Sequence, residues 1–414
     1  MRSGTGAIAT AALLLAVATG ACAGHLPACP AAGGPAWTEV QGAHFRLRTD
    51  GDAAAGRAAL DDLEQFQAAL LTVFGAPANH DTGRMPVIVV DRGWTDFAPH
   101  RVSGYFTRAL FQPLIVMRAG SDLFRQDVIK HELVHYFSGM VMPRQPPWLS
   151  EGLAIYYETL EYDPGEGRIT VGRPPPDLLR VAQRIGASGI ATVLAAEAID
   201  DDADDFYATA WITVHYLMNH RVEALARYEK VLHEGGTQAA AWTAAFGAQT
   251  PANVGAEVMR YVDGGQYALL RYRFTAPQHA SPAERRLSDA ETHATRALLY
   301  LTGPNLRRHS PDLAPGVDDP RSEAKTEISE ALRQEPDHVA ARAIAHYMLG
   351  TPIALEQATL LSRKHPDDWL AWLLVATASP GRDGGTNQND ALERALDLAT
   401  RDPSIHIPVS GEQK

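Results

Sequence analysis

Residues 128–140, VIKHELVHYFSGM, contain two histidines and a glutamate at a spacing that could support chemistry. His131, Glu132 and His135 form the pattern H-E-x-x-H. In a helix, residues four positions apart lie one turn apart on the same face, so the two imidazoles could bind one metal ion. Glu132 would project beside that ion, where a carboxylate can take a proton from a bound water. The spacing therefore predicts a zinc site that activates water.

The residues around this pattern predict a helix that is buried on most sides. Its apolar positions are Phe124, Val128, Ile129, Leu133, Val134, Phe137 and Met140. Burying histidines in such a helix is costly unless they are paired or bound to an ion. Zinc in hydrolases takes three protein ligands and leaves a fourth position for water, so a third ligand is needed.

Residues 146–158, PPWLSEGLAIYYE, offer that ligand. Pro146 and Pro147 end the preceding loop and predict the start of a second helix, with Glu151 in its first turns. Gly152 would let that helix approach a neighbouring segment closely.

The two segments together resemble the gluzincin metallopeptidases, in which a helix carrying H-E-x-x-H is followed by a helix carrying W-L-x-E-G-x-A. The run here is WLSEGLA, residues 148–154, which matches at every fixed position. The resemblance implies one zinc ion, Zn2+, with His131, His135 and Glu151 as its ligands and Glu132 as the base. The two motifs are independent, so their joint occurrence favours zinc binding more strongly than either motif alone.

The resemblance covers roughly residues 36–275 and implies an edge strand before the zinc helix that pairs with an extended peptide substrate. Residues 113–118, PLIVMR, are the candidate, and an ordinary core strand is the alternative. Glu158, seven residues beyond Glu151, fits the aminopeptidase-type form of the family. The G-x-M-E-N signature that holds a free amino terminus is absent from the sequence, which favours an endopeptidase.

A zinc peptidase also needs a donor to the oxyanion, commonly a tyrosine or histidine from a later helix. The segment 207–219, YATAWITVHYLMN, carries both types. Tyr207, at its start as in gluzincin-like chains, is the predicted catalytic donor. His215 is the second candidate, and packing is the alternative for both residues.

Hydrophobic patterning predicts a mixed α+β fold. Strands are expected at residues 37–40, 43–48, 85–90 and 113–118, and a helix is expected at 52–74. With the resemblance, this predicts a zincin-like domain that combines a mixed sheet with the active-site helices.

The chain is predicted to contain a peptidase domain at 36–275 and an all-α domain at 284–404. The second is alanine-rich, with Pro-Asp turns at Pro336 and Pro366 that lie 30 residues apart. That spacing is near the 34-residue period of tetratricopeptide helix pairs. A helical-repeat domain that binds a protein partner is therefore predicted, and an ordinary helical subdomain is the alternative.

Residues 1–29 are predicted to be a secretory signal, because a positive charge precedes an apolar stretch at 7–17 and then small residues. A loose lipobox would leave Cys22 lipidated, and ordinary signal cleavage is the alternative. The only other cysteine is Cys29, so a metal in the body of the protein must be held by His, Asp and Glu. The chain is expected to be exported to the bacterial envelope, in the periplasm or anchored to a membrane.

The formal net charge of -12 argues against nucleic acid or an anionic lipid surface as the main partner, because both would repel the protein. Membrane attachment is expected only through a lipid at Cys22.

Taken together, the residues predict an exported zinc endopeptidase that acts on a peptide or protein substrate. A non-catalytic zinc-containing scaffold that works through its helical repeats is the rival hypothesis. Hydrolysis of a non-peptide amide is a third, because the zinc chemistry would be the same.

Overall fold

The structure is a computed structural model. It describes residues 29–75, 82–120, 127–142, 144–163, 165–199, 203–278, 281–307, 319–379 and 388–407. Residues 1–28 of the predicted signal, Cys22 among them, lie outside the described residues. Among the helices that are described, none combines the length and hydropathy needed to cross a bilayer.

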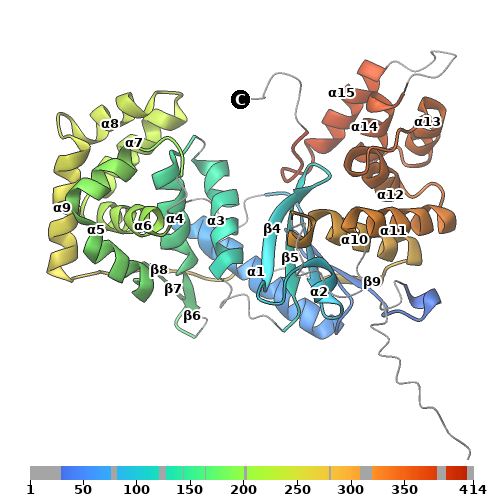
Figure 1. The fold of residues 1–414 in the computed structure, drawn as a ribbon, viewed down its shortest axis with the longest axis horizontal. Helices are drawn as coiled ribbons and strands as arrows, with labels where there is room; N and C mark the ends of the chain where they lie inside the picture. The colour runs from blue at the N-terminus through green and yellow to red at the C-terminus, as the bar shows by residue number, and fades with distance from the viewer. Residues whose placement is uncertain are drawn as a thin grey trace, which may run out of the picture.

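A mixed six-stranded sheet organises one half of the molecule (Figure 1). Its strands are β1 (Thr38–Gln41), β2 (Phe45–Thr49), β3 (Met85–Val90), β4 (Gly104–Ala109), β5 (Gln112–Arg118) and β9 (Ala283–Arg286). The spatial order is β4-β5-β3-β2-β1-β9. Strands β2, β3 and β5 are parallel, while β1 and β4 are antiparallel to their neighbours. The strands expected from the patterning are all present.

Helices cover both faces of this sheet. They include α1 (Ala53–Val73), α2 (Trp94–Phe97), α3 (Asp127–Val141), α10 (Asp289–Thr302), α11 (Pro320–Gln334) and α12 (Val339–Ala343). Val87 and Val89 of β3 belong to the core shared with α1 and α3, whereas Ile88 and Val90 belong to the core shared with α2, α10, α11 and α12. A strand buried on both faces reads as a continuous apolar run, which explains the sequence MPVIVV.

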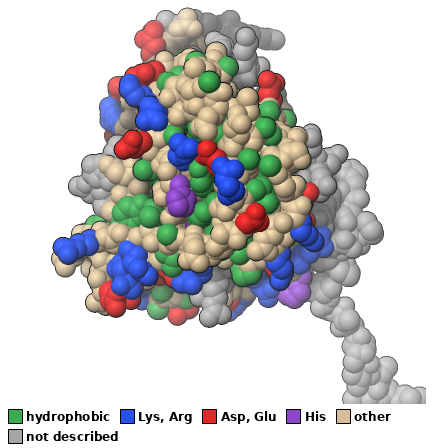
Figure 2. All heavy atoms as spheres, turned by 90° about the vertical axis from the view of Figure 1, so that its left-hand side faces the viewer, with side chains coloured by type: hydrophobic (Ala, Val, Ile, Leu, Met, Phe, Trp, Pro, Cys, Tyr) green, Lys and Arg blue, Asp and Glu red, His purple; other side chains and the backbone are tan. Residues whose placement is uncertain are grey.

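The other half is a helical lobe, with a small sheet of order β6-β7-β8 at one side. Its elements are α4 (Pro147–Glu158), β6 (Glu161–Asp163), β7 (Arg168–Val171), α5 (Pro176–Ala195), α6 (Ala203–His220), α7 (Val222–His233), α8 (Gln238–Phe246), α9 (Pro251–Gly264) and β8 (Leu270–Arg273). Figure 2 faces the outer end of this lobe, where side chains of both charges are interspersed with hydrophobic ones.

The sheet and the helices together confirm the mixed α+β class. The zincin architecture stays a prediction.

Three further helices complete the C-terminal region: α13 (Leu355–Lys364), α14 (Trp369–Thr377) and α15 (Gln388–Ala399). The predicted Pro-Asp turns separate helices, because Pro336 lies between α11 and α12 and Pro366 lies between α13 and α14. The region is also joined to the rest of the chain, since β9 extends the main sheet and α10 packs on it. The repeat assignment stays a prediction.

Of the two alternatives for residues 113–118, the structure supports the core strand and contradicts the edge strand. Strand β5 is interior, paired with β3 on one side and with β4 on the other. The edge strand on this side of the sheet is β4, which forms a hairpin with β5 through a two-residue turn, and β9 is the edge strand on the other side. The run PLIVMR predicts a buried strand but not its neighbours, because an apolar run indicates burial without specifying strand order.

Gly152 allows α4 and α6 to pack at close range. A Cβ atom built there would lie 2.5 Å from the carbonyl oxygen of Ala210 and 2.5 Å from Cγ2 of Val214. Since a backbone atom cannot move aside as a side chain can, we expect Gly152→Ala to lower the free energy of unfolding by about 1–3 kcal/mol in urea denaturation. The control is Gly139→Ala, because a Cβ at that position of α3 meets no atom within 4 Å. Equal stabilities of the two variants would contradict the argument.

Candidate metal centre

Helix α3 presents the H-E-x-x-H residues on its open side. Four of its side chains are fully buried in the core, namely Ile129, Leu133, Val134 and Phe137. Val128 and Met140 are instead 59% and 37% exposed, so the prediction of a helix buried on most sides is wrong. Helix α3 packs on the core with one side only. Its other side, which carries His131 and His135, is half-buried.

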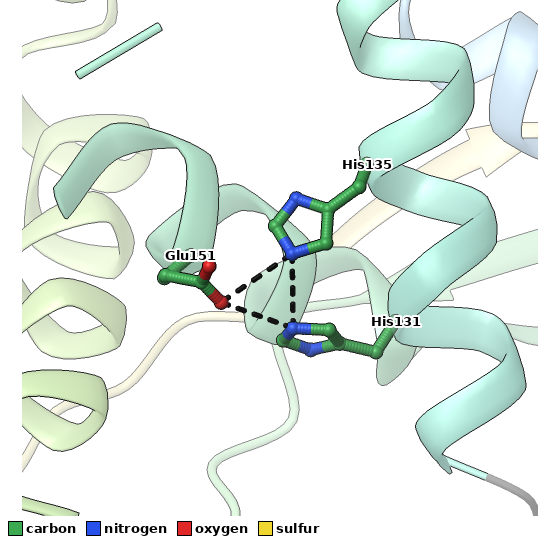
Figure 3. Close-up of side chains that lie close together, drawn as sticks. All are labelled: His131, His135 and Glu151. Atoms are coloured by element: carbon green, nitrogen blue, oxygen red, sulfur yellow. Dashed lines mark hydrogen bonds and ion pairs between the residues drawn. The ribbon is translucent and has the colours of Figure 1, made fainter. Parts of the chain in front are cut away.

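Helix α4 brings the predicted third ligand to the two histidines. It begins at Pro147, as expected, and carries Glu151 in its second turn. Nε2 of His131 lies 3.1 Å from Oε2 of Glu151 and 3.1 Å from Nε2 of His135. Nε2 of His135 lies 3.4 Å from the same carboxylate oxygen. Figure 3 shows the three side chains pointing toward one another from the two helices.

The outer nitrogens of both imidazoles also have partners. Nδ1 of His131 lies 2.8 Å from Oε2 of Glu158, and Nδ1 of His135 lies 3.0 Å from Oγ of Ser150. A carboxylate can only accept, so in a neutral His131 the contact with Glu158 would hold the proton on Nδ1 and leave the Nε2 lone pair for a metal ion. Ser150 can hold His135 in the same tautomer. The Nε2 lone pairs of His131 and His135 and a carboxylate oxygen of Glu151 would then point at one place, where a bound cation would stabilise them.

The pKa shifts of His131 and Glu151 also indicate that positive charge is favourable at this site. Burial lowers the pKa of His131, but the carboxylates of Glu151 and Glu158 outweigh it and raise the pKa to about 9. Burial raises the pKa of Glu151, but His131 and His135 outweigh it and bring the pKa to about 2. The carboxylates thus favour positive charge between these groups, which a proton or a metal ion can supply.

The donor set fits zinc. Ligand atoms about 2.1 Å from a tetrahedral zinc are about 3.4 Å apart. The three separations here are 3.1, 3.1 and 3.4 Å. The His131, His135 and Glu151 side chains are 19%, 24% and 15% exposed, so the site is reachable from solvent. With three ligands among the described residues and access from outside, the site has the form of a catalytic zinc site, whereas structural sites are closed by four ligands.

Glu132 and Tyr207 lie beside these ligands. Glu132 is half-buried and makes no hydrogen bond or ion pair with any residue that the structure describes. Tyr207 lies in the first turns of α6, and partial burial together with the charges of Glu151 and Glu132 raises the pKa of its phenol. The phenol therefore stays protonated and able to donate at neutral pH. The catalytic roles of both residues stay predictions.

His215 does not belong to this site. It is fully buried, with Nε2 2.8 Å from the carbonyl oxygen of Gly172 and Nδ1 2.7 Å from the Tyr261 hydroxyl. Burial lowers the pKa of this imidazole. Packing, the alternative considered for His215, is what the structure supports.

Sequence reasoning assigned no role to Glu158 or Ser150. The signal for Glu158 was its spacing of seven residues from Glu151, which places both carboxylates on one side of α4, toward His131. No local signal marks Ser150, because a serine next to a ligand is common and its partner is set by how α3 packs on α4.

We expect Glu158→Gln to weaken zinc binding about 10- to 100-fold, because second-sphere carboxylates orient a ligating imidazole and increase its basicity. The measurement is competition with a chromophoric chelator. Glu161→Gln is the matched control, since Glu161 is exposed and pairs with Arg173 instead. Equal zinc affinities of the two variants would show that Glu158 does not support His131.

A family model described as "Protein of unknown function (DUF1570)" matches residues 127–236. That segment begins with α3 and extends just past the end of α7, so it contains all the residues of the candidate centre. No curated protein matches the chain.

Proposed function

We propose that this chain is a zinc-dependent endopeptidase with a zincin-like fold of the gluzincin type. The observation that carries the proposal is the convergence of His131, His135 and Glu151 next to Glu132, a carboxylate with no partner in the described residues. A carboxylate next to a metal site is suited to take a proton from a bound water.

In this proposal His131, His135 and Glu151 hold the zinc. The bound zinc supplies a water of lowered pKa and polarises the substrate carbonyl. Glu132 takes the proton of the attacking water and passes it to the leaving amine. Tyr207 donates to the oxyanion as the tetrahedral centre forms.

Strand β4, which no other described strand pairs with on its outer side, is the proposed place for the substrate backbone, in the role first expected of residues 113–118. An extended peptide can add to an exposed sheet edge through main-chain hydrogen bonds. Strand β4 lies beside α3, where the ring of Phe106 is 6.4 Å from that of Tyr136. Tyr136 is one turn beyond Glu132, so an added strand would run past the proposed base.

A cavity of about 430 Å3 next to the centre offers room for a substrate side chain. Lys130, Glu158, Glu161 and Arg173 line it, together with a wall of prolines at 174–176. Glu158 links the cavity to the metal ligand His131. Opposite charges on its lining would suit a polar side chain better than a large apolar one.

We propose that the protein is exported to the bacterial envelope through its N-terminal signal. There it is either anchored to a membrane by a lipid on Cys22 or located in the periplasm. This rests on the N-terminal sequence. A protein partner for the C-terminal helices belongs to the same proposal. The rival scaffold hypothesis gives no physical reason for a glutamate beside the metal site that has no partner among the described residues.

The test is cleavage of a diverse peptide library by the purified protein, read by mass spectrometry. Zinc is quantified first, then removed with a chelator and restored. We expect cleavage that is lost with zinc and recovered on its return. Bound zinc without any cleavage would favour the scaffold, and a protein that binds no zinc would refute the proposal.

A further inference from the structure

The turn of the β4–β5 hairpin has a backbone conformation that its residues disfavour. Leu110 and Phe111 both have positive φ, at 47° and 66°. Two-residue turns of this kind favour Asn-Gly, because the Cβ of a larger residue crowds the backbone there. Among the described non-glycine residues, Arg144 alone shares a positive φ. Contacts from outside the hairpin must therefore hold this turn.

The C-terminal region makes those contacts. The ring of Phe111 packs edge-on against Tyr347, with 5.0 Å between the ring centroids, and against Trp369 at 6.2 Å. The backbone N–H of His406 donates to the carbonyl oxygen of Phe111 at 2.8 Å. The turn is thus fixed by a pair of aromatic rings and a backbone hydrogen bond, all from residues after 340.

Tyr347 itself lies in an unusual backbone segment. Residues Ile344–Met348 form a π-helix, the one such segment within the described ranges. π-helical turns are rare and occur frequently at functional sites. The Tyr347 hydroxyl is held in turn by Thr377 Oγ1 at 2.8 Å. Two rare backbone conformations, the left-handed turn and the π-helix, therefore meet at the contact between Phe111 and Tyr347.

Strand β4 joins this turn to the side of α3, the helix that carries His131 and His135. It is the edge of the sheet, and Figure 1 shows the hairpin reaching from the side of α3 toward α12. It is held by the turn at one end, by pairing with β5 along its length, and by side-chain packing on α3 and on the core shared with α2 and α10. The turn is the support that comes from the C-terminal region, so a change there would loosen the end of β4 next to Ala109.

We infer that the C-terminal helices hold the β4 edge in the position that receives the substrate, with Phe111 as the positioning residue. The inference rests on the proposed peptidase function. Phe111 acts through the strand and touches none of the zinc ligands, so its loss should weaken substrate binding and leave zinc binding intact.

The first experiment measures amide hydrogen exchange of β4 in the full chain. We expect Phe111→Ala and Tyr347→Ala to speed exchange about 2- to 12-fold, the factor that corresponds to one aromatic pair. Tyr347→Phe keeps the ring and should exchange like the wild type. The matched control is Trp372→Ala, because Trp372 packs on the same C-terminal core but makes no ring contact with Phe111 among the described residues, and its Nε1–H donates to the carbonyl oxygen of Pro366. Unchanged β4 exchange in Phe111→Ala would overturn the inference.

The second experiment uses a peptide that the wild type cleaves. We expect Phe111→Ala and Tyr347→Ala to raise KM by similar factors, with kcat and zinc content little changed. The KM of the double variant should be no higher than that of either single variant. An unchanged KM, or the same rise in Trp372→Ala, would overturn the inference. If the wild type cleaves nothing, the proposed function fails, and β4 exchange alone decides whether the C-terminal helices hold the edge.

Discussion

Replacing Glu132 by glutamine is expected to lower kcat/KM for peptide cleavage about 100- to 10,000-fold, the usual contribution of a general base. The amide has nearly the same shape but cannot accept the proton of the attacking water. Because Glu132 makes no hydrogen bond or ion pair with the described residues, its neutralisation should disturb no structural contact. Zinc content and the urea midpoint should therefore match those of the wild type.

The control for this variant is Glu223→Gln, which removes one carboxylate from an exposed position on α7. It should retain full activity. Activity of Glu132→Gln within a few-fold of the wild type would exclude Glu132 as the base, even if zinc is present. Loss of both activity and zinc would instead indicate that the variant had disturbed the ligands, and zinc quantification separates these outcomes.

Replacing His131 by alanine is expected to abolish stoichiometric zinc binding. Zinc sites with four protein ligands bind with about 10–16 kcal/mol, so one ligand contributes roughly 3 kcal/mol, or about 150-fold in affinity. The variant also leaves the carboxylates of Glu151 and Glu158 without their shared imidazole. The measurement is zinc content after dialysis against a weak chelator.

A second measurement makes this prediction independent of activity. Zinc that binds only the folded state raises the thermal midpoint, so the wild type should be stabilised by added zinc and His131→Ala should not. The control is His233→Ala, at an exposed position near the end of α7, which should respond like the wild type. A zinc-dependent midpoint in His131→Ala would place the metal elsewhere in the protein.

Parts of the candidate centre could be predicted from sequence because they depend only on residues that are close together in the chain. His131 and His135 share a helix face through their spacing alone, and Pro147 fixes where the next helix begins. The first strands and α1 were also predictable from their hydrophobic periodicity. In each case the property depends on residues within one or two turns, and the structure agrees with the prediction.

What the sequence determined by itself is a set of helices and strands with a metal-binding pattern on two of them. Only the tertiary structure decided which partners these elements meet: Glu158 and Ser150 behind the imidazoles, β4 rather than β5 at the edge, and the C-terminal helices on the sheet and at the β4–β5 turn. The physical reason is that periodicity records which side of an element is buried, whereas the identity of the covering segment depends on packing between residues far apart in the chain.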